Sequence, residues 1–165
     1  MSRIIISVYV NNQSGVLNRI CSLFSRRGFN IDTLSVGETE DPNYSRMTIT
    51  MDGDDYARLQ VVNQLNKVHD VKKVEILELA TSARRELALI KVGVSSETRQ
   101  DIISAVNIFR CSIIDYTPEA VIVEVTGEAT KIDAFIEVMK PFGIMEVART
   151  GLAALQRGNT CMLDK

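Results

Sequence analysis

The sequence predicts an α+β protein of two ferredoxin-like (βαββαβ) domains in tandem. Two observations carry this prediction. Short β-rich apolar runs alternate with segments whose apolar residues recur at helical spacing, and the same order of elements occurs twice within 165 residues. We place the first domain at residues 1–80, the second at 84–158 and a tail at 159–165. A short stretch of small residues at 80–83 is expected to link the two domains.

In the first half, turn residues separate each element from the next. Gly28, which follows two arginines, suits the C-terminus of the first helix. The expected elements are a strand at 4–10, a helix with Val16, Leu17, Ile20, Leu23 and Phe24 inward, a hairpin of 30–37 and 44–51, a helix opened by Asp52–Asp55 with Leu59, Val62 and Leu65 inward, and a strand at 71–79.

The second half repeats this order. The expected elements are a strand at 86–94, a helix capped by Ser95 and Ser96 with Ile102, Ile103, Val106 and Phe109 inward, a hairpin of 111–117 and 120–126, a helix at 131–139 and a strand at 144–150. In this fold the helices cover one face of each sheet. The other face carries alternating apolar residues, so we expect it to pair with a second chain or with the sister domain.

Composition and charge exclude several classes of protein. The chain is 45% hydrophobic with a net charge of -2, so it lacks the basic surplus of a nucleic-acid-binding protein. Its apolar runs are far shorter than the roughly 20 residues that a membrane-spanning helix needs. Cys21, Cys111 and Cys161 are widely spaced and form no CxxC motif, which indicates neither a disulfide framework nor a metal site and favours the cytoplasm. Cys21 is expected to pack in the core.

No catalytic constellation is recognisable in the sequence. His69 is the sole histidine, so neither a Ser-His-Asp arrangement nor a histidine metal site has its usual residues. Asp52, Asp54 and Asp55 stand at a helix start, where carboxylates are favoured by the helix dipole. The phosphate-binding motifs GxGxxG and GxxxxGK[ST] are absent. We therefore expect no catalytic residues, no metal and no cofactor on this chain.

One segment indicates a binding site. Asn12-Gln13-Ser14-Gly15-Val16 joins the end of a strand to the start of a helix, and the free N–H groups of a helix start attract anions. Gly15 has no side chain to block a close approach, and a free amino acid's carboxylate has a suitable size. The amide of Asn30 offers both a donor and an acceptor. An alternative interpretation is that Asn12 and Gly15 form an ordinary tight turn and that Asn30 caps another.

The stretch Asn12–Leu17, followed by Leu23-Phe24-Ser25-Arg26-Arg27-Gly28-Phe29-Asn30-Ile31, resembles an ACT domain, a small-molecule sensor of amino-acid biosynthesis. More narrowly, the chain resembles the regulatory subunits of acetolactate synthase. This likeness extends from Arg3 to about Gly158 and includes Arg85-Glu86-Leu87-Ala88-Leu89, Ile113-Ile114-Asp115-Tyr116-Thr117-Pro118 and Glu146-Val147-Ala148-Arg149-Thr150-Gly151.

The resemblance implies a function that spacing does not reveal. Such a subunit forms a homodimer, activates a large catalytic subunit and confers feedback inhibition by a branched-chain amino acid, usually valine. Thiamine diphosphate, magnesium and FAD belong to that catalytic partner. The family's effector site corresponds to residues of the first domain, where two such domains meet: Asn12, Gly15, Val16, Asn30 and Ile31, with Gly37 nearby.

The expected binding mode places the effector's carboxylate on the N–H groups near Gly15 and its ammonium on Asn12 and Asn30. Its alkyl group would contact Val16 and Ile31. One alternative is a stand-alone amino-acid-binding regulator of another enzyme or of transcription, although no helix-turn-helix or positive stripe is visible. Another is an RNA-binding module of the same fold, which would need strand aromatics for base stacking, and the chain has only nine aromatics, five Phe and four Tyr.

Overall fold

The computed structural model describes residues 2–163, which form two compact units. The first unit contains the described residues up to Ala83 together with those from Gly151 onward, and the second unit is Arg84–Thr150. Each unit contains the β-α-β-β-α-β order, so the predicted tandem of ferredoxin-like domains is confirmed. Residues 151–158, which the sequence assigns to the second domain, group with the first unit instead.

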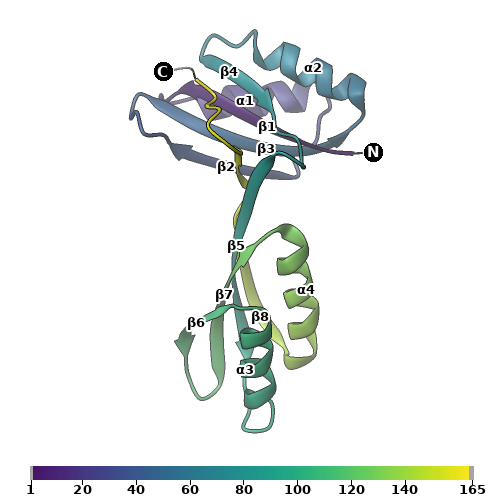
Figure 1. Ribbon diagram of the computed structural model, residues 1–165, viewed down its shortest axis with the longest axis vertical. Coiled ribbons are helices and arrows are strands. Elements are labelled where there is room, and N and C mark those ends of the chain that lie inside the picture. Colours follow the sequence, from purple (N-terminus) through teal and green to yellow (C-terminus); the bar gives the residue numbers. More distant parts are fainter. Residues whose placement is uncertain (1, 164–165) are drawn as a thin grey trace. The chain divides into compact units, whose positions relative to one another are not determined.

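The first unit has an antiparallel sheet in the order β2-β3-β1-β4, with two helices on one face (Figure 1). Ile6, on the central strand, lies opposite Ile49 on one neighbouring strand and Ile76 on the other. All three contribute to the core beneath the helices. The elements are β1 (Ser2–Asn11), α1 (Val16–Arg26), β2 (Thr33–Glu38), β3 (Tyr44–Gly53), α2 (Asp55–Leu65) and β4 (Val71–Ile76).

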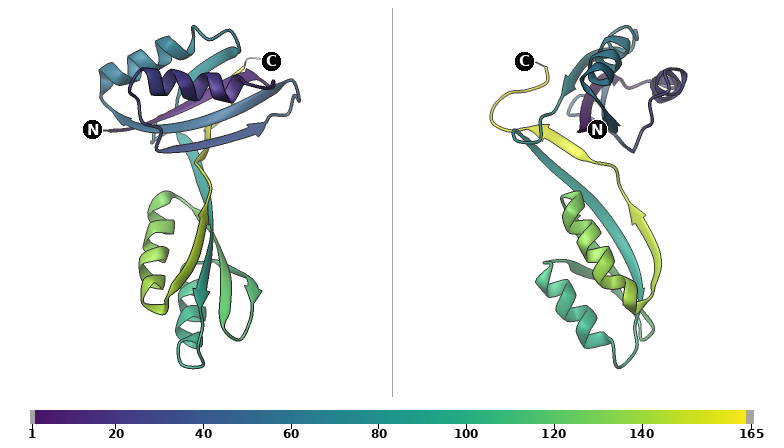
Figure 2. Two further views of the ribbon diagram at one scale, coloured as in Figure 1. Left: turned by 180° about the vertical axis from the view of Figure 1, so that it is seen from behind. Right: turned by 90° about the vertical axis from the view of Figure 1, so that its right-hand side faces the viewer.

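The second unit repeats this arrangement, with strands in the order β6-β7-β5-β8 and two helices on one face (Figure 2). Its core centres on Ile90, which lies opposite the buried Val123 of β7. Both central strands shift register near one end, between Tyr9 and Val10 and between Lys91 and Val92. The elements are β5 (Ser82–Gly93), α3 (Arg99–Ile108), β6 (Ser112–Tyr116), β7 (Ala120–Gly127), α4 (Ala129–Met139), a 3-10 turn (Lys140–Phe142) and β8 (Ile144–Arg149).

Residues 151–163, here called the C-terminal segment, cover part of the first unit's other sheet face. The segment contains a short strand, β9 (Ala153–Gln156), and the backbone N–H of Arg157 after it donates to the carbonyl oxygen of Thr81, also of the first unit, at 2.8 Å. Leu152, Ala154 and Met162 are buried, and the first two form a cluster with Ile5 and Leu77. Because Ile5 alternates with the core residues of β1, this cluster lies on the face away from α1 and α2 (Figure 2). Part of the cover expected from a second chain or a sister domain therefore comes from the chain's own C-terminal segment.

Several local predictions are wrong. Leu17 and Leu59, expected to face inward, are exposed, and in α2 the buried residues are Val61 and Leu65. The second unit's first helix begins at Arg99, later than the predicted cap at Ser95 and Ser96. The expected linker at 80–83 ends inside β5, because Ser82 is buried and its hydroxyl donates a hydrogen bond to the carbonyl oxygen of Glu78 at 2.7 Å.

Candidate effector site

Asn12 holds the corner between β1 and α1 by donating two hydrogen bonds to backbone carbonyl oxygens. Its backbone N–H donates to the carbonyl oxygen of Asn43 at 2.7 Å, and its side-chain Nδ2 donates to the carbonyl oxygen of Pro42 at 2.9 Å. Both bonds anchor the corner on the β2–β3 loop. The amide nitrogen of Asn12 is therefore engaged in structure, and its side-chain oxygen is the atom that remains to accept a hydrogen bond from an ammonium group.

Gly15 is the N-cap of α1, with φ 86° and ψ -10°. This left-handed conformation favours glycine, and no side chain caps the helix. The first turn of α1 also contains no acidic residue. The first N–H groups of a helix lack intrahelical acceptors, so this end of α1 offers donors and the positive pole of the helix dipole to an anion.

Two charged side chains that sequence reasoning missed lie beside this corner. Arg19 Nη1 pairs with Asp70 Oδ2 at 2.8 Å, and Arg19 Nε lies 3.5 Å from the carbonyl oxygen of Gly15. Arg19 is half exposed, whereas the side chain of Asp70 is only 5% exposed. The sequence could have indicated Arg19, because it lies four residues after Gly15 and residues four apart lie on the same face of a helix. The sequence could not have indicated Asp70, because this residue is distant from α1 along the chain and approaches it only in the folded structure.

Asn30 and Ile31 lie beyond the other end of α1. The helix ends through Gly28, with φ 72°, and the backbone N–H of Phe29 donates to the carbonyl oxygen of Phe24 at 3.0 Å. The 11 residues of α1 span about 16 Å at 1.5 Å per residue, so one chain holds Gly15 and Asn30 too far apart for one small amino acid. The structure does not bring all the predicted residues together within one chain.

Val16 lies at the corner but faces the core. It is only 2% exposed, and it packs with the residues beneath α1. An alkyl group could contact its side chain only if that side chain left the core. Leu17, the next residue, is 42% exposed at the same end of the helix. Leu17, rather than Val16, therefore exposes an apolar side chain at this corner.

Gly37 lies on β2, opposite Arg46 of β3, and a Cβ added there would meet no atom within 4 Å. Leu34, three residues earlier on β2, packs against the core beneath the helices. Because side chains alternate along a strand, Gly37 faces away from the helices. There Gly37 lines a cavity of about 210 Å³ with Arg46 and Ala153–Leu155 of the C-terminal segment. Gly37 therefore belongs to a different face of the sheet from the Gly15 corner.

Asn30 is exposed, and its Nδ2 donates to Asp32 Oδ1 at 3.0 Å, which leaves its own amide oxygen as a possible acceptor. Ile31 is half-buried and packs against the core. This second half of the candidate site combines one polar and one apolar side chain.

Residues that could have served as catalytic or metal-binding groups lie in a turn or cap a helix. His69 is exposed in the turn before β4, and Asp54 caps α2 by accepting a hydrogen bond from the backbone N–H of Ala57 at 2.8 Å. Within residues 2–163, no three His, Cys, Asp or Glu side chains gather into a group that could hold a metal ion. Over the same residues, no helix is long and apolar enough to cross a membrane.

Comparisons with known proteins match nearly the whole chain. A family model described as the small subunit of acetolactate synthase matches residues 85–158, and one described as an AHAS small subunit-like ACT domain matches residues 6–73. The first domain is therefore an ACT domain, as the resemblance implies.

Individual relatives agree with these matches. A probable acetolactate synthase small subunit of Methanothermobacter thermautotrophicus is 51% identical over 159 residues, covering 96% of this chain and 95% of that protein. The acetolactate synthase small subunit of Mycobacterium bovis is 46% identical over 153 residues, covering 93% and 91%. The crystal structure of the acetolactate synthase small subunit from Thermotoga maritima superimposes with a TM-score of 0.91 at 40% identity, covering 97% of this chain and all of that one.

Proposed function

The chain belongs to the acetolactate synthase small-subunit family, the regulatory subunits of that enzyme, and on this premise we propose how it acts. It activates the large catalytic subunit and makes that subunit subject to feedback inhibition by a branched-chain amino acid, of which valine is the first candidate. It contributes no catalytic residue. Thiamine diphosphate, magnesium and FAD are bound by the catalytic partner, and the complex acts in the cytoplasm.

The observation that carries this proposal is the uncapped start of α1. Gly15 takes φ 86° there, no side-chain oxygen occupies the helix N-terminus, and the first turn has no carboxylate. A helix that lacks its own cap leaves these donors to a ligand. An amino acid's carboxylate can supply the missing acceptor, with Arg19 adding a positive charge one turn along.

The separation of the two half-sites supports a site built by two chains. Asn30 and Ile31 of one chain lie about one helix length, roughly 16 Å, from that chain's own Gly15. In a symmetric dimer a surface on one copy meets the matching surface of the other. We propose that the Gly15 corner of one copy faces Asn30 and Ile31 of its partner, so that a dimer holds two equivalent sites.

Regulation then follows as a coupling between two sites. The effector stabilises one arrangement of the regulatory dimer, and the catalytic subunit is most active with another. Coupling of this kind is typically about 1–3 kcal/mol, and for binding equilibria it is reciprocal. Ligands of the catalytic site should therefore weaken effector binding by the factor with which the effector weakens theirs.

The first test is Gly15→Asp. Aspartate adds a negative charge and bulk where the effector's carboxylate docks, and a Cβ at this position would lie 3.5 Å from Arg19 Nη2. We expect valine binding to weaken at least tenfold, about 1.4 kcal/mol, while activation of the large subunit persists. Calorimetry with valine and an acetolactate assay with both subunits measure the two effects.

Gly143→Asp is the matched control. Gly143 also has a positive φ, 89°, although its ψ of 86° differs from the -10° of Gly15, and nothing lies within 4 Å of its added Cβ. It belongs to the second unit, so this variant should also place a side chain at a positive φ but keep normal feedback. Normal valine inhibition in Gly15→Asp would contradict the site. An unchanged catalytic rate on adding the wild-type chain would favour a stand-alone regulator of another process.

A mixed dimer tests the sharing of the site. A Gly15→Asp chain and an Asn30→Ala chain should each bind valine poorly as homodimers. In a heterodimer, the intact Asn30 of the first chain meets the intact Gly15 of the second, which restores one site. Calorimetry on tagged, purified heterodimers should give half the wild-type stoichiometry. No recovery of binding would mean that each chain builds its own site.

A further inference from the structure

The C-terminal segment is a fitted part of the first unit. A Cβ added at Gly151 would lie 2.4 Å from the carbonyl oxygen of Leu34, so the segment passes directly over the β2 backbone. Further along, Met162 is 5% exposed and its Sδ accepts a hydrogen bond from Ser7 Oγ at 3.5 Å. Contacts at both ends therefore hold the segment on the sheet face away from the helices.

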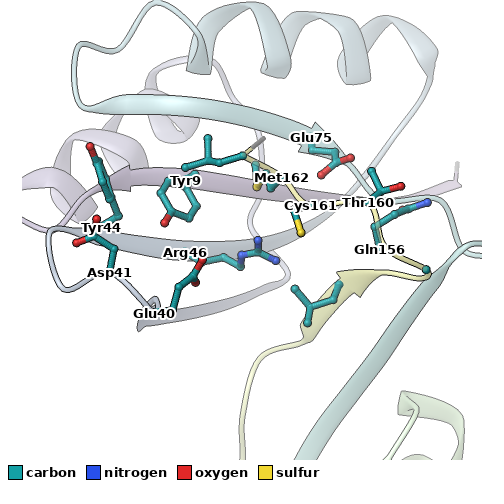
Figure 3. A pocket seen from close by; sticks show the side chains of 13 residues that line it. Tyr9, Glu40, Asp41, Tyr44, Arg46, Glu75, Gln156, Thr160, Cys161 and Met162 are labelled. Carbon is teal, nitrogen blue, oxygen red and sulfur yellow. The ribbon is translucent and has the colours of Figure 1, made fainter. Parts of the chain in front are cut away.

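Between these two contacts the segment roofs a cavity of about 590 Å³ (Figure 3). This volume lies within the range of small-molecule sites. The sheet contributes residues from the ends of its strands and from the β2–β3 loop, and the segment contributes the other wall. The lining residues that matter below are Tyr9, Arg46 and Glu75 from the sheet and Leu155, Met162 and Leu163 from the segment.

Opposite charges enter this cavity from two strands. Arg46 lies on β3 opposite Tyr9, and Glu75 lies on β4 opposite Ser7, so β1 separates the two charges. Figure 3 shows both side chains directed into the cavity from different sides. Both are half-buried, and within residues 2–163 neither takes part in an ion pair.

The other charges of the lining narrow the choice of ligand. Glu40 and Asp41 also line the cavity, and Asp41 accepts hydrogen bonds from Asn43 at 2.9 and 2.8 Å. A simple anion would meet three carboxylates, and a simple cation would meet the guanidinium of Arg46. A zwitterion satisfies both signs, and charge complementarity of this kind gives specificity. The apolar roof of Leu155, Met162 and Leu163 suits an aliphatic side chain.

We propose that this cavity is a second small-molecule site, which binds a free amino acid with an aliphatic side chain. The carboxylate pairs with Arg46, the ammonium pairs with Glu75, and the side chain lies under the C-terminal segment. The site is separate from the Gly15 corner and needs no second chain. Because the roof belongs to the C-terminal segment, occupancy of the cavity fixes that segment in place.

Calorimetry on the full-length Gly15→Asp chain with leucine, isoleucine and valine separates the two sites. We expect about one remaining site per chain for at least one of these amino acids. Isovalerate, which lacks the ammonium, and isoamylamine, which lacks the carboxylate, should each bind at least tenfold more weakly. Absence of heat with all three amino acids would overturn the proposal, and it would leave the Gly15 corner untouched.

Two further changes test whether the binding that remains in the Gly15→Asp chain takes place in this cavity. Glu75→Gln in the same background should weaken binding at least tenfold, whereas Glu97→Gln, an exposed carboxylate of the second unit, should leave it unchanged. A chain that ends after Gln156 keeps the buried Leu152 and Ala154 and the lining residue Leu155 but loses Met162 and Leu163 of the roof, so it should bind at least tenfold more weakly. If Glu75→Gln and this shorter chain both bind normally, the ligand lies elsewhere.

Nuclear magnetic resonance of labelled methionine methyl groups gives a readout independent of heat. The Met162 methyl signal, assigned by its loss in Met162→Leu, should shift on addition of the amino acid in the Gly15→Asp chain. Met139, buried in the second unit, serves as the internal reference and should not shift. A titration in which Met162 stays still while heat is released would contradict the cavity assignment.

Discussion

The first helix of each unit occupies the same topological position, yet the two helix starts differ. The start of α1 is Gly15, with no cap and no acidic residue in the first turn. Ahead of α3 the side chains of Ser95 and Thr98 close the preceding turn, although the N-cap Thr98 itself bonds to no N–H group of the helix. Thr98 Oγ1 accepts from the backbone N–H of Ser95 at 3.0 Å, Ser95 Oγ accepts from that of Thr98 at 3.2 Å, and Asp101 stands in the first turn.

The sheet faces opposite the helices differ in the same sense. In the first unit Ser7, Thr48 and Thr50 are buried there, under or beside the C-terminal segment. In the second unit the apolar residues that alternate with the core residues of β5 and β7, Leu89 and Ile122, are only half-buried. One topology therefore carries two roles. The difference lies in a few residues at a helix start and in one added segment, which illustrates that sites rather than folds determine function.

The largest expected effect on stability comes from removing the C-terminal segment, which covers part of the sheet face opposite the helices in the first unit. A chain that ends after Thr150 loses the burial of Leu152 and Met162 and exposes Ile5 and Leu77. At about 1.5–3 kcal/mol for each large apolar side chain, the exposure of Ile5 and Leu77 alone should cost the first unit about 3–6 kcal/mol of unfolding free energy. Hydrogen exchange should accelerate in β1 and β4 and stay unchanged in β7. Equal protection in both chains would show that the segment adds no stability.

Next in size are paired core truncations. Phe24 of the first unit and Phe135 of the second are fully buried and contact Phe29 and Phe109 edge-on, with ring centroids 6.2 and 5.4 Å apart. Each change to alanine should cost about 3–5 kcal/mol. Urea unfolding followed by hydrogen exchange should assign each loss to its own unit. Loss of protection across both units from either change would contradict their description as two compact cores.

A smaller effect tests the closed turn ahead of α3. Replacing Ser95 and Thr98 together by alanine removes both reciprocal hydrogen bonds, so the second unit should lose about 1 kcal/mol. The heat of valine binding should stay the same, because an open helix start alone lacks the surroundings of the Gly15 corner. New valine binding by this variant would mean that the uncapped helix suffices.

The smallest effect concerns cysteine reactivity. Burial raises the pKa of the Cys111 thiol, and the positive charge of Lys131 partly offsets this. The folded state therefore favours the neutral thiol, so any stability linked to it is lost as the pH rises through the raised pKa. Iodoacetamide should label exposed Cys161 first and reach Cys111 only as the pH rises from about 7 to 9, as followed by peptide mass spectrometry. Equal labelling rates at pH 7 would contradict this burial.

Periodicity predicted the order of the elements well, because each buried face repeats regularly along the chain. It failed in α2, where Leu59, Val62 and Leu65 follow three-residue spacing but Val61 and Leu65 are the buried pair. Apolar spacing indicates only roughly which side of a helix is buried, and tertiary packing decides which of the neighbouring residues lie in the core. It also missed β9, since Ala153–Gln156 is too short and too weakly apolar for a pattern.

The candidate site was predictable only in part. The Gly15 corner is local, so a turn, a glycine and a helix start within a few residues indicated it. The contributions of Arg19 and Asp70, and the distance between Gly15 and Asn30, depend on how distant segments fold together. Val16 and Leu17 show the limit most clearly. Both are apolar and adjacent, and only helix orientation decides which one faces solvent.

The discontinuity of the first unit has a consequence for biosynthesis. A ribosome makes the strands and helices of this unit first, but the residues that seal its open face follow only after the whole second unit. Nascent domains usually complete folding in the order of synthesis, and contacts between distant segments form slowly. Here the half of the chain that begins folding first should finish last, and until then a chaperone would meet the exposed Ile5 and Leu77.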